Sequence, residues 1–235
     1  MIKGYIIRIK EHSDSEILAK ICRDSWIKNN RNWPILYFDA ITPELNESIM
    51  TRDFLDWEYP WEGEHLDMGT GLLKKAYPTK NPGARISCAL SHYTLWKQCI
   101  EDNKPIAILE HDAIFTRAID ISILESKFDI IGINDPRRAT RLSEKYFNDI
   151  QNVYRTSRKK VMSVPKIDSY EVPQGLAGNS AYIIKPKGAK NMLKLVKEHG
   201  LWPNDALMCR QLINNLGVTT SFYTKVQIHK STTTL

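Results

Sequence analysis

The sequence has few cysteines and no long apolar run, and each scarcity excludes a class of protein. Its 235 residues include four cysteines, at positions 22, 88, 99 and 209. These lack the paired spacing of a zinc site and lie in helical, largely apolar settings, so we expect reduced structural thiols. No run approaches a membrane span, and the first ten residues are too charged for a signal peptide. Without repeats or low-complexity tracts, a cytoplasmic single α/β domain over residues 1–235 is expected.

The charge of the chain is unevenly distributed. Net charge is +6. Residues 1–120 carry 15 Lys and Arg against 18 Asp and Glu, which gives −3, whereas residues 121–235 carry 18 against 9, which gives +9. A basic surface on the C-terminal half suits an anionic partner, or peripheral contact with anionic membrane lipid.

The most informative stretch is a short apolar run that ends in acidic residues. Residues 106–109 predict a strand buried on both faces of a mostly parallel sheet, with Glu110, His111 and Asp112 at its C-terminal end. In open α/β sheets the ligand crevice lies outside that end. Two carboxylates there suit Mg²⁺ or Mn²⁺, particularly if a diphosphate completes the shell. An acidic strand end without a ligand is the alternative.

The N-terminal region predicts strand, helix and strand at the spacing of a nucleotide-binding sheet. Residues 3–9 and 35–39 are the strands. Ser13 and Glu16 form a capping-box pattern that opens a helix over residues 13–28. An amphipathic helix over residues 84–101 precedes the acidic strand.

Two further regions each leave two interpretations open. Residues 43–82 are predicted to be irregular, and acidic residues alternate there with Trp57, Tyr59 and Trp61. They suit a sugar-binding lid or, in the favoured interpretation, a surface insertion whose aromatics anchor it to the core. Residues 137–160 carry eight basic residues against two acidic ones. They suit either a polyanion-binding segment or a solvated amphipathic helix.

The C-terminal third predicts alternating strands and helices. A strand is expected over residues 129–134, then a turn in which Gly175 and Gly178 permit close backbone approach to a ligand. A strand over residues 180–184 and a helix over 186–199, ended by Gly200, follow. Asp205 is expected to cap a helix over residues 206–215, and a strand over 219–223 precedes the tail.

Four sequence blocks resemble glycosyltransferase family 25 in the right order. They read CALSHYTLWK from Cys88, AILEHDA from Ala107, GNSAYIIKPKGAK from Gly178 and, more weakly, WPND from Trp202. That family contains lipooligosaccharide and collagen galactosyltransferases. His111 departs from the pattern, because the family usually has a second Asp there.

The resemblance and the strand-end positions together predict a set of site residues. The acceptor's proton is expected to pass to Asp205, or otherwise to Asp135. Ser91 and His92 match the family's Ser-His pair, and His92 is expected to shape the site through a hydrogen bond to the donor or to the acidic strand end. The nucleotide-sugar site is expected to comprise Arg8, Asp39, Ala40, Ser91, His92, Gly178 and Asn179, and the Mn²⁺ or Mg²⁺ site Glu110, Asp112 and His229.

The resemblance implies a GT-A-like α/β fold. It also implies a metal-dependent, inverting transfer of a sugar from a nucleotide diphosphate sugar to an acceptor hydroxyl, with a UDP-sugar as the favoured donor. The favoured acceptor is a lipooligosaccharide or another glycan. Phosphorylated sugars of such an acceptor would contact the basic surface of the C-terminal half. One alternative is a bacteriophage enzyme that glycosylates hydroxymethylated bases of DNA in the host cytoplasm. Another is an inactive glycan- or nucleic-acid-binding relative, suggested by His111.

Within one domain we expect a nucleotide-binding start (1–42), an insertion (43–82), the signature region (83–135), a basic insertion (136–173) and an acceptor-side half (174–235).

Overall fold

The computed structural model describes residues 1–137 and 142–227, and it is built around a seven-stranded sheet. The strand order is β2 (Ile35–Asp39), β1 (Lys3–Arg8), β5 (Ile106–Glu110), β9 (Ala181–Ile184), β7 (Ile130–Gly132), β10 (Leu216–Thr219) and β8 (Val161–Ser163). Strands β9 and β8 run antiparallel to their neighbours, and the other pairs are parallel. The predicted α/β fold with a mostly parallel central sheet is confirmed.

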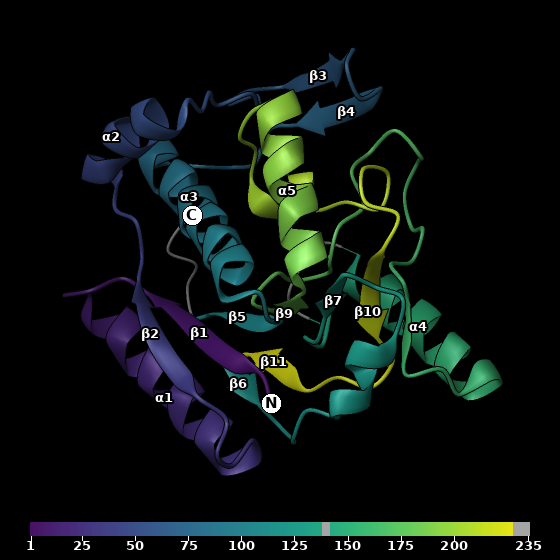
Figure 1. Ribbon diagram of the computed structural model, residues 1–235. Coiled ribbons are helices and arrows are strands. Elements are labelled where there is room, and N and C mark those ends of the chain that lie inside the picture. The colour runs from purple at the N-terminus through teal and green to yellow at the C-terminus, as the bar shows by residue number, and fades with distance from the viewer. Residues whose placement is uncertain (138–141, 228–235) are drawn as a thin grey trace.

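Helices cover both faces of this sheet (Figure 1). Helices α3 (Pro82–Asp102) and α5 (Pro186–His199) lie side by side over one face, and α1 (Ser13–Asn29) packs against the other. Along β5, Ile106 and Ile108 belong to the core under α3, whereas Ala107 and Leu109 belong to the core on the α1 side. A buried Ile or Leu contributes about 1.5–3 kcal/mol, so both faces of β5 stabilise the fold.

The strand directions bring polar residues to one edge of the sheet. Arg8 at the end of β1 lies in register with Asp39 at the end of β2, and Ile7 lies in register with Glu110 at the end of β5. Because β9 is antiparallel, its beginning lies at the same edge, where Leu109 is in register with Ala181. Segments from four parts of the chain therefore meet where a ligand crevice is expected.

Residues 43–82 are more regular than predicted. They form helix α2 (Pro43–Asp53) and a hairpin of β3 (Glu64–Asp67) and β4 (Leu72–Lys75). Trp57 and Trp61 stack with ring centroids 4.9 Å apart, and buried Tyr59 packs on Trp202. These contacts match an insertion anchored to the core by its aromatics. The prediction failed because α2 and the hairpin carry mixed charged and apolar residues without a strong hydrophobic period.

A buried lysine fixes the hairpin to the rest of the molecule. The Lys74 side chain is 2% exposed, and its ammonium donates to the carbonyl oxygen of Glu58 at 2.6 Å and pairs with Asp67. The same ammonium lies 4.2 Å from the ring centroid of Trp202. Because Trp202 begins the segment that carries Asp205, this contact connects the hairpin to the candidate site.

The predicted start of the first helix was wrong, and the predicted end of α5 is confirmed. His12, not Ser13, is the N-cap of α1, and its Nδ1 accepts the backbone N–H of Ser15 at 3.4 Å. Glu16 nevertheless accepts the N–H of Glu11 at 3.2 Å, as a carboxylate near a helix start does. Gly200 ends α5 with a φ of 76°, as predicted.

The predicted helix over residues 206–215 is also wrong. Helix α6 spans only Asn204–Leu207, and Pro203 is its N-cap, so Asp205 is not a cap. The chain then pairs with another loop, since Gly175 forms a β-bridge with Cys209 and Arg210 N–H donates to the Gln174 carbonyl at 2.9 Å. These tertiary hydrogen bonds replace the helical ones that sequence propensity favours.

The last predicted strand, over residues 219–223, is wrong as well. The chain leaves the large sheet after β10 and forms β11 (Thr224–Val226), which pairs with β6 (Ala113–Phe115). The predicted tail residue His229 lies outside the described residues. No helix in residues 1–137 or 142–227 is both long and apolar enough to cross a membrane.

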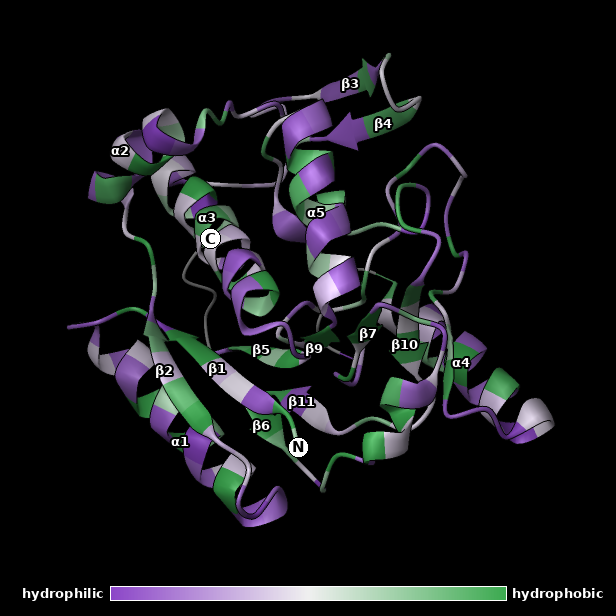
Figure 2. Cartoon of the chain, in the orientation of Figure 1, coloured by the Kyte–Doolittle hydropathy of each residue, from purple (hydrophilic) through white to green (hydrophobic). Residues whose placement is uncertain are grey.

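The predicted basic segment contains helix α4 (Ser143–Ser157). Its buried residues are Tyr146 and Ile150, and most of its remaining residues are hydrophilic (Figure 2). Arg155, Arg158 and Lys159 are exposed at its C-terminal end. This geometry is an amphipathic helix with a basic end, which leaves the choice between a solvated face and an anion-binding face open.

Candidate active site

Helix α3 presents three functional side chains in a row toward the end of β5. Arg85, Cys88 and His92 have spacings of three and four residues, which places them on one side of the helix. The guanidinium of Arg85 lowers the pKa of Glu110, and the sulfur of Cys88, the ring of His92 and the carboxylate of Glu110 are close neighbours. The acidic strand end therefore meets a helix that carries a cation, a thiol and an imidazole.

His92 faces the acidic strand end. Its ring is fully buried, and Nε2 lies 3.4 Å from Oε1 of Glu110. Burial alone would raise the pKa of Glu110, but His92, His111 and Arg85 together lower it. Glu110 is therefore ionised at neutral pH. Of the two roles predicted for His92, the structure brings it to the acidic strand end.

Asp205 lies close enough to Glu110 for their charges to interact. Burial raises the pKa of the Asp205 carboxyl, the positive charge of Arg85 lowers it, and the negative charge of Glu110 raises it further, with a net upward shift. Gly175 makes this position possible, because a Cβ there would lie 2.3 Å from the carbonyl oxygen of Asp205. Gly175 thus allows close backbone approach to the Asp205 segment, and because it also lines the cavity beside Asp205, its predicted approach to a ligand stays a prediction.

A cavity opens beside Asp205. Its volume is about 460 Å³, and its lining includes Tyr59, Tyr77, Tyr146 and Asp168 besides Asp205. Arg85 lies 5.2 Å from the ring centroid of Tyr77. Aromatic faces, hydroxyl groups and carboxylates together suit a polyhydroxylated ligand such as a sugar.

Asp112 and His111 follow Glu110 and point to different surroundings. The carboxylate of Asp112 contributes to the raised pKa of Cys88, so its charge acts within the same cluster. His111 instead contacts α1, where its Nδ1 lies 3.1 Å from Oγ of Ser15. The charge of Asp112 also raises the pKa of Cys22 on the α1 side, after burial, so the pairing of Glu110 with Asp112 in a metal site stays a prediction, and His229 falls in a segment that is not described.

The residues predicted for the donor divide into two groups. Arg8 donates from Nε to Asp39 at 2.9 Å, and Ala40 N–H donates to the Arg8 carbonyl at 2.7 Å. Ser91 accepts the N–H of Ile41 at 2.9 Å and so ties α3 to this strand end. These contacts gather the ends of β1 and β2 with α3.

Gly178 and Asn179 form the second group, at the entrance to β9. Gly178 has a φ of 76°, a left-handed conformation that favours glycine. The Asn179 side chain is 8% exposed, and within the described part of the chain neither its Oδ1 nor its Nδ2 has a hydrogen-bond partner. A buried amide of this kind is suited to bind a polar ligand.

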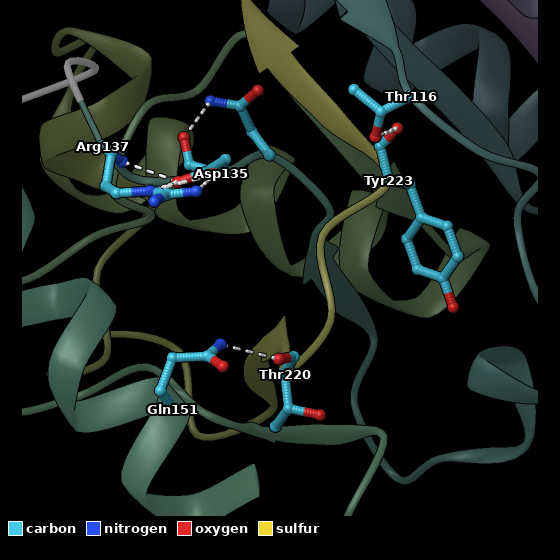
Figure 3. Close-up of polar contacts among 7 residues, drawn as sticks. Thr116, Asp135, Arg137, Gln151, Thr220 and Tyr223 are labelled. Carbon is cyan, nitrogen blue, oxygen red and sulfur yellow. Dashed lines mark hydrogen bonds and ion pairs between the residues drawn. The ribbon is translucent and has the colours of Figure 1, made fainter.

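Asp135 is committed to another interaction. Arg137 donates to it from Nη2 at 2.6 Å and from Nε at 3.1 and 3.2 Å, a forked pair that Figure 3 shows. The charges that shift the pKa of Asp205 come from Arg85 and Glu110. Asp205 is therefore the carboxylate that the structure associates with the acidic strand end.

Sequence reasoning missed Arg85, Cys88 and the tyrosines of the cavity. Their signal was present in part, since Arg85 and Cys88 share the helix side of His92. Tyr59, Tyr77 and Tyr146 come from three separate segments. No local pattern could have joined those three positions.

The fold and the site define an α/β protein with a carboxylate-lined crevice at the strand ends. The family model described as glycosyltransferase family 25 (LPS biosynthesis protein) matches residues 1–208, and the chain belongs to this family. A Haemophilus influenzae protein named "Putative glycosyltransferase" is 26% identical over 178 residues, which are 73% of this chain and 51% of that protein. The chain spans about half the length of this relative. Mouse xyloside xylosyltransferase 1, in its apo form, aligns with 91% of this chain and 80% of its own, at 10% identity and a TM-score of 0.38.

Proposed function

We propose that the protein transfers a sugar from a nucleotide diphosphate sugar, with a UDP-sugar as the first choice, to a hydroxyl of a glycan acceptor, with inversion. The observation that carries this proposal is the meeting of Glu110, Asp112 and Asp205 with Arg85 at the strand ends of a family 25 protein. The family's description as an LPS biosynthesis protein favours a lipopolysaccharide-type acceptor.

Glu110 and Asp112 fit a divalent cation. Both are carboxylates, and the lowered pKa of Glu110 keeps it charged at neutral pH. Mn²⁺ or Mg²⁺ bound there would offset the negative charge that grows on the leaving diphosphate. Arg85 supplies a further positive charge in the same crevice, since it lowers the pKa of both Glu110 and Asp205.

The ends of β1 and β2 are the proposed nucleotide side of the crevice. Arg8, Asp39 and Ala40 lie there, and Ser91 ties α3 to the same edge. Gly178 and Asn179 would face the diphosphate or the donor sugar, because the unpartnered amide of Asn179 can both donate and accept.

Asp205 is the proposed general base, ahead of Asp135. Its raised pKa supports the assignment, since a base accepts a proton better when its pKa approaches the working pH. The cavity of about 460 Å³ beside it would hold the reacting sugar against the tyrosines. Asp135 is less suited because Arg137 occupies its carboxylate.

A donor screen tests this proposal. Thermal shifts are measured with UDP-, GDP- and CMP-sugars, with and without Mn²⁺, because a ligand that binds the native state raises the melting temperature. We expect one nucleotide class to stabilise the protein, and to do so more with Mn²⁺. Stabilisation by none of them, with or without the metal, would contradict the proposed function.

A further inference from the structure

Three potential metal-ligand atoms converge between α3 and β5. Among the described residues, Sγ of Cys88, a ring nitrogen of His92 and a carboxylate oxygen of Glu110 all lie within 4.8 Å of one another. Cys88 and His92 are four residues apart on one helix, the spacing that places two ligands on the same face. Glu110 approaches from the end of the adjacent strand. Thiolate, imidazole and carboxylate are the three ligand types that zinc accepts.

The orientation of His92 resembles that of a metal ligand. Its ring is fully buried, and Nε2 has no hydrogen-bond partner in residues 1–137 and 142–227. Its Nδ1 lies 2.8 Å from the hydroxyl of Tyr182, which accepts the indole N–H of Trp96 at 2.9 Å. In the metal-bound form the proton sits on Nδ1, which donates to this hydroxyl, and Nε2 directs its lone pair at the ion; without a metal, the proton on Nε2 points at Glu110 and lowers the pKa of that carboxyl. Metal-bound histidines are held in this way by an outer partner on the second ring nitrogen.

The separations suit a tetrahedral ion. Two ligands each about 2.0–2.1 Å from one tetrahedral zinc are about 3.3 Å apart, and Nε2 of His92 lies 3.4 Å from Oε1 of Glu110. Oδ1 of Asn204 accepts a hydrogen bond from the Cys88 thiol, with 3.8 Å between oxygen and sulfur. In the described part of the chain, Nδ2 of this buried Asn204 has no hydrogen-bond partner. Three protein ligands beside a polar wall leave a fourth position for water or an oxygen ligand.

We propose that Cys88, His92 and Glu110 bind a thiophilic divalent cation, of which Zn²⁺ is the best fit. The sulfur ligand separates this site from the oxygen-only set that Mg²⁺ and Mn²⁺ prefer. Burial is the main cause of the raised pKa of the Cys88 thiol, and the charges of Glu110, Asp205 and Asp112 add to it while Arg85 opposes them, so three carboxylates against one guanidinium favour a cation beside the sulfur. The site goes beyond the proposed transferase activity and does not depend on it. Glu110 would be shared, so zinc and the donor-bound cation compete for it.

Cobalt titration of the chelator-treated full chain tests the site without an activity assay. Co²⁺ replaces Zn²⁺ in tetrahedral sites, and a thiolate ligand gives it a charge-transfer band in the near ultraviolet. We expect this band together with the intense visible bands of tetrahedral Co²⁺, and we expect one equivalent of Zn²⁺ to abolish both. Wild-type protein that shows neither band at saturating Co²⁺ would overturn the proposal.

Variants assign the ligands. Loss of a residue that holds a metal ligand from outside typically lowers metal affinity by about 10- to 100-fold, so Tyr182→Phe should weaken Zn²⁺ binding by about 10-fold. Cys88→Ser removes a ligand itself and should weaken Zn²⁺ binding by at least about 100-fold. Cys209→Ser is the control, because Cys209 is a free thiol that is not part of the cluster. If Cys88→Ser fails to fold, a band retained in single Ser variants of Cys22, Cys99 and Cys209 still assigns it to Cys88. A band lost in one of those three would refute the assignment.

Discussion

Replacing Asp205 with Asn separates a general base from a structural carboxylate. The amide keeps the shape of the side chain but cannot accept the acceptor's proton. A positioned base contributes about 10²–10⁴-fold to rate, so we expect the turnover number to fall by at least about 100-fold while donor binding is retained. The assay is transfer from the donor identified in the screen to a lipooligosaccharide core oligosaccharide. Asp56→Asn is the control, since Asp56 is an exposed carboxylate that does not line this cavity.

Stability should move in the opposite direction from activity. Burial and the charge of Glu110 raise the pKa of Asp205, so the folded protein binds this proton more tightly than the unfolded chain does. The free energy of unfolding therefore falls as pH rises from the ordinary Asp value through the raised pKa. The neutral Asn side chain does not carry this buried charge, so the loss of unfolding free energy is absent in Asp205→Asn. At neutral pH the melting temperature of this variant should equal or exceed that of the wild type. The wild-type kcat/KM should fall as pH is lowered through the raised pKa. Normal turnover in Asp205→Asn, or lost stability without lost rate, would refute the assignment to a base.

Three further changes test the cation, the hairpin and the acceptor surface. Asp112→Asn should abolish Mn²⁺-dependent turnover with an unchanged melting temperature, because a strand-end carboxylate contributes charge and little packing; wild-type turnover would contradict the metal assignment. Lys74→Met should lower the free energy of unfolding, measured with urea, by about 1–3 kcal/mol, because it leaves Asp67 and the Glu58 carbonyl without their buried donor. The control Lys75→Met should change the free energy of unfolding little, because the Lys75 side chain is half-exposed. Replacing the basic residues at the end of α4 together with Glu should raise the KM for an anionic acceptor and leave donor hydrolysis unchanged. If the acceptor is DNA, each lost phosphate contact should also flatten the slope of log affinity against log salt concentration by about 0.7–0.9. Unchanged kinetics and an unchanged salt response would show that this surface is only a solvated face. The residues reversed are Arg155, Arg158, Lys159 and Lys160.

The central sheet was predictable because its signal is local. Residues 106–109 form a continuous apolar run, and both faces of the resulting strand are buried. Strand direction then placed Glu110 and Arg8 at one edge without further information. Helix α6 was not predictable in this way. Its sequence continues with helix formers, but the loop around Gly175 takes the backbone hydrogen bonds that a longer helix would have used.

The site was predictable only where a motif carried it. Glu110 and His92 belong to contiguous blocks, and the structure brings them together with Cys88. Asp112, from the same block as Glu110, adds to the raised pKa of Cys88. Asp205 was selected on weaker grounds, and the reason given for its structural alternative was wrong, since Pro203 is the cap. Arg85 and the cavity tyrosines arise from tertiary packing of segments far apart in the chain, which periodicity and spacing do not encode.

The direction of His111 bears on whether the chain is an inactive relative. His111 was the only sequence feature that favoured lost activity, because it stands where the family usually has an acidic residue. Its ring contacts Oγ of Ser15 on the α1 side of the sheet, whereas Glu110 beside it faces His92 on α3. The imidazole also lowers the pKa of Glu110, so it supports the charged form of that carboxylate. The substitution therefore favours the charged form of Glu110, and His111 by itself gives no reason to regard the chain as an inactive relative.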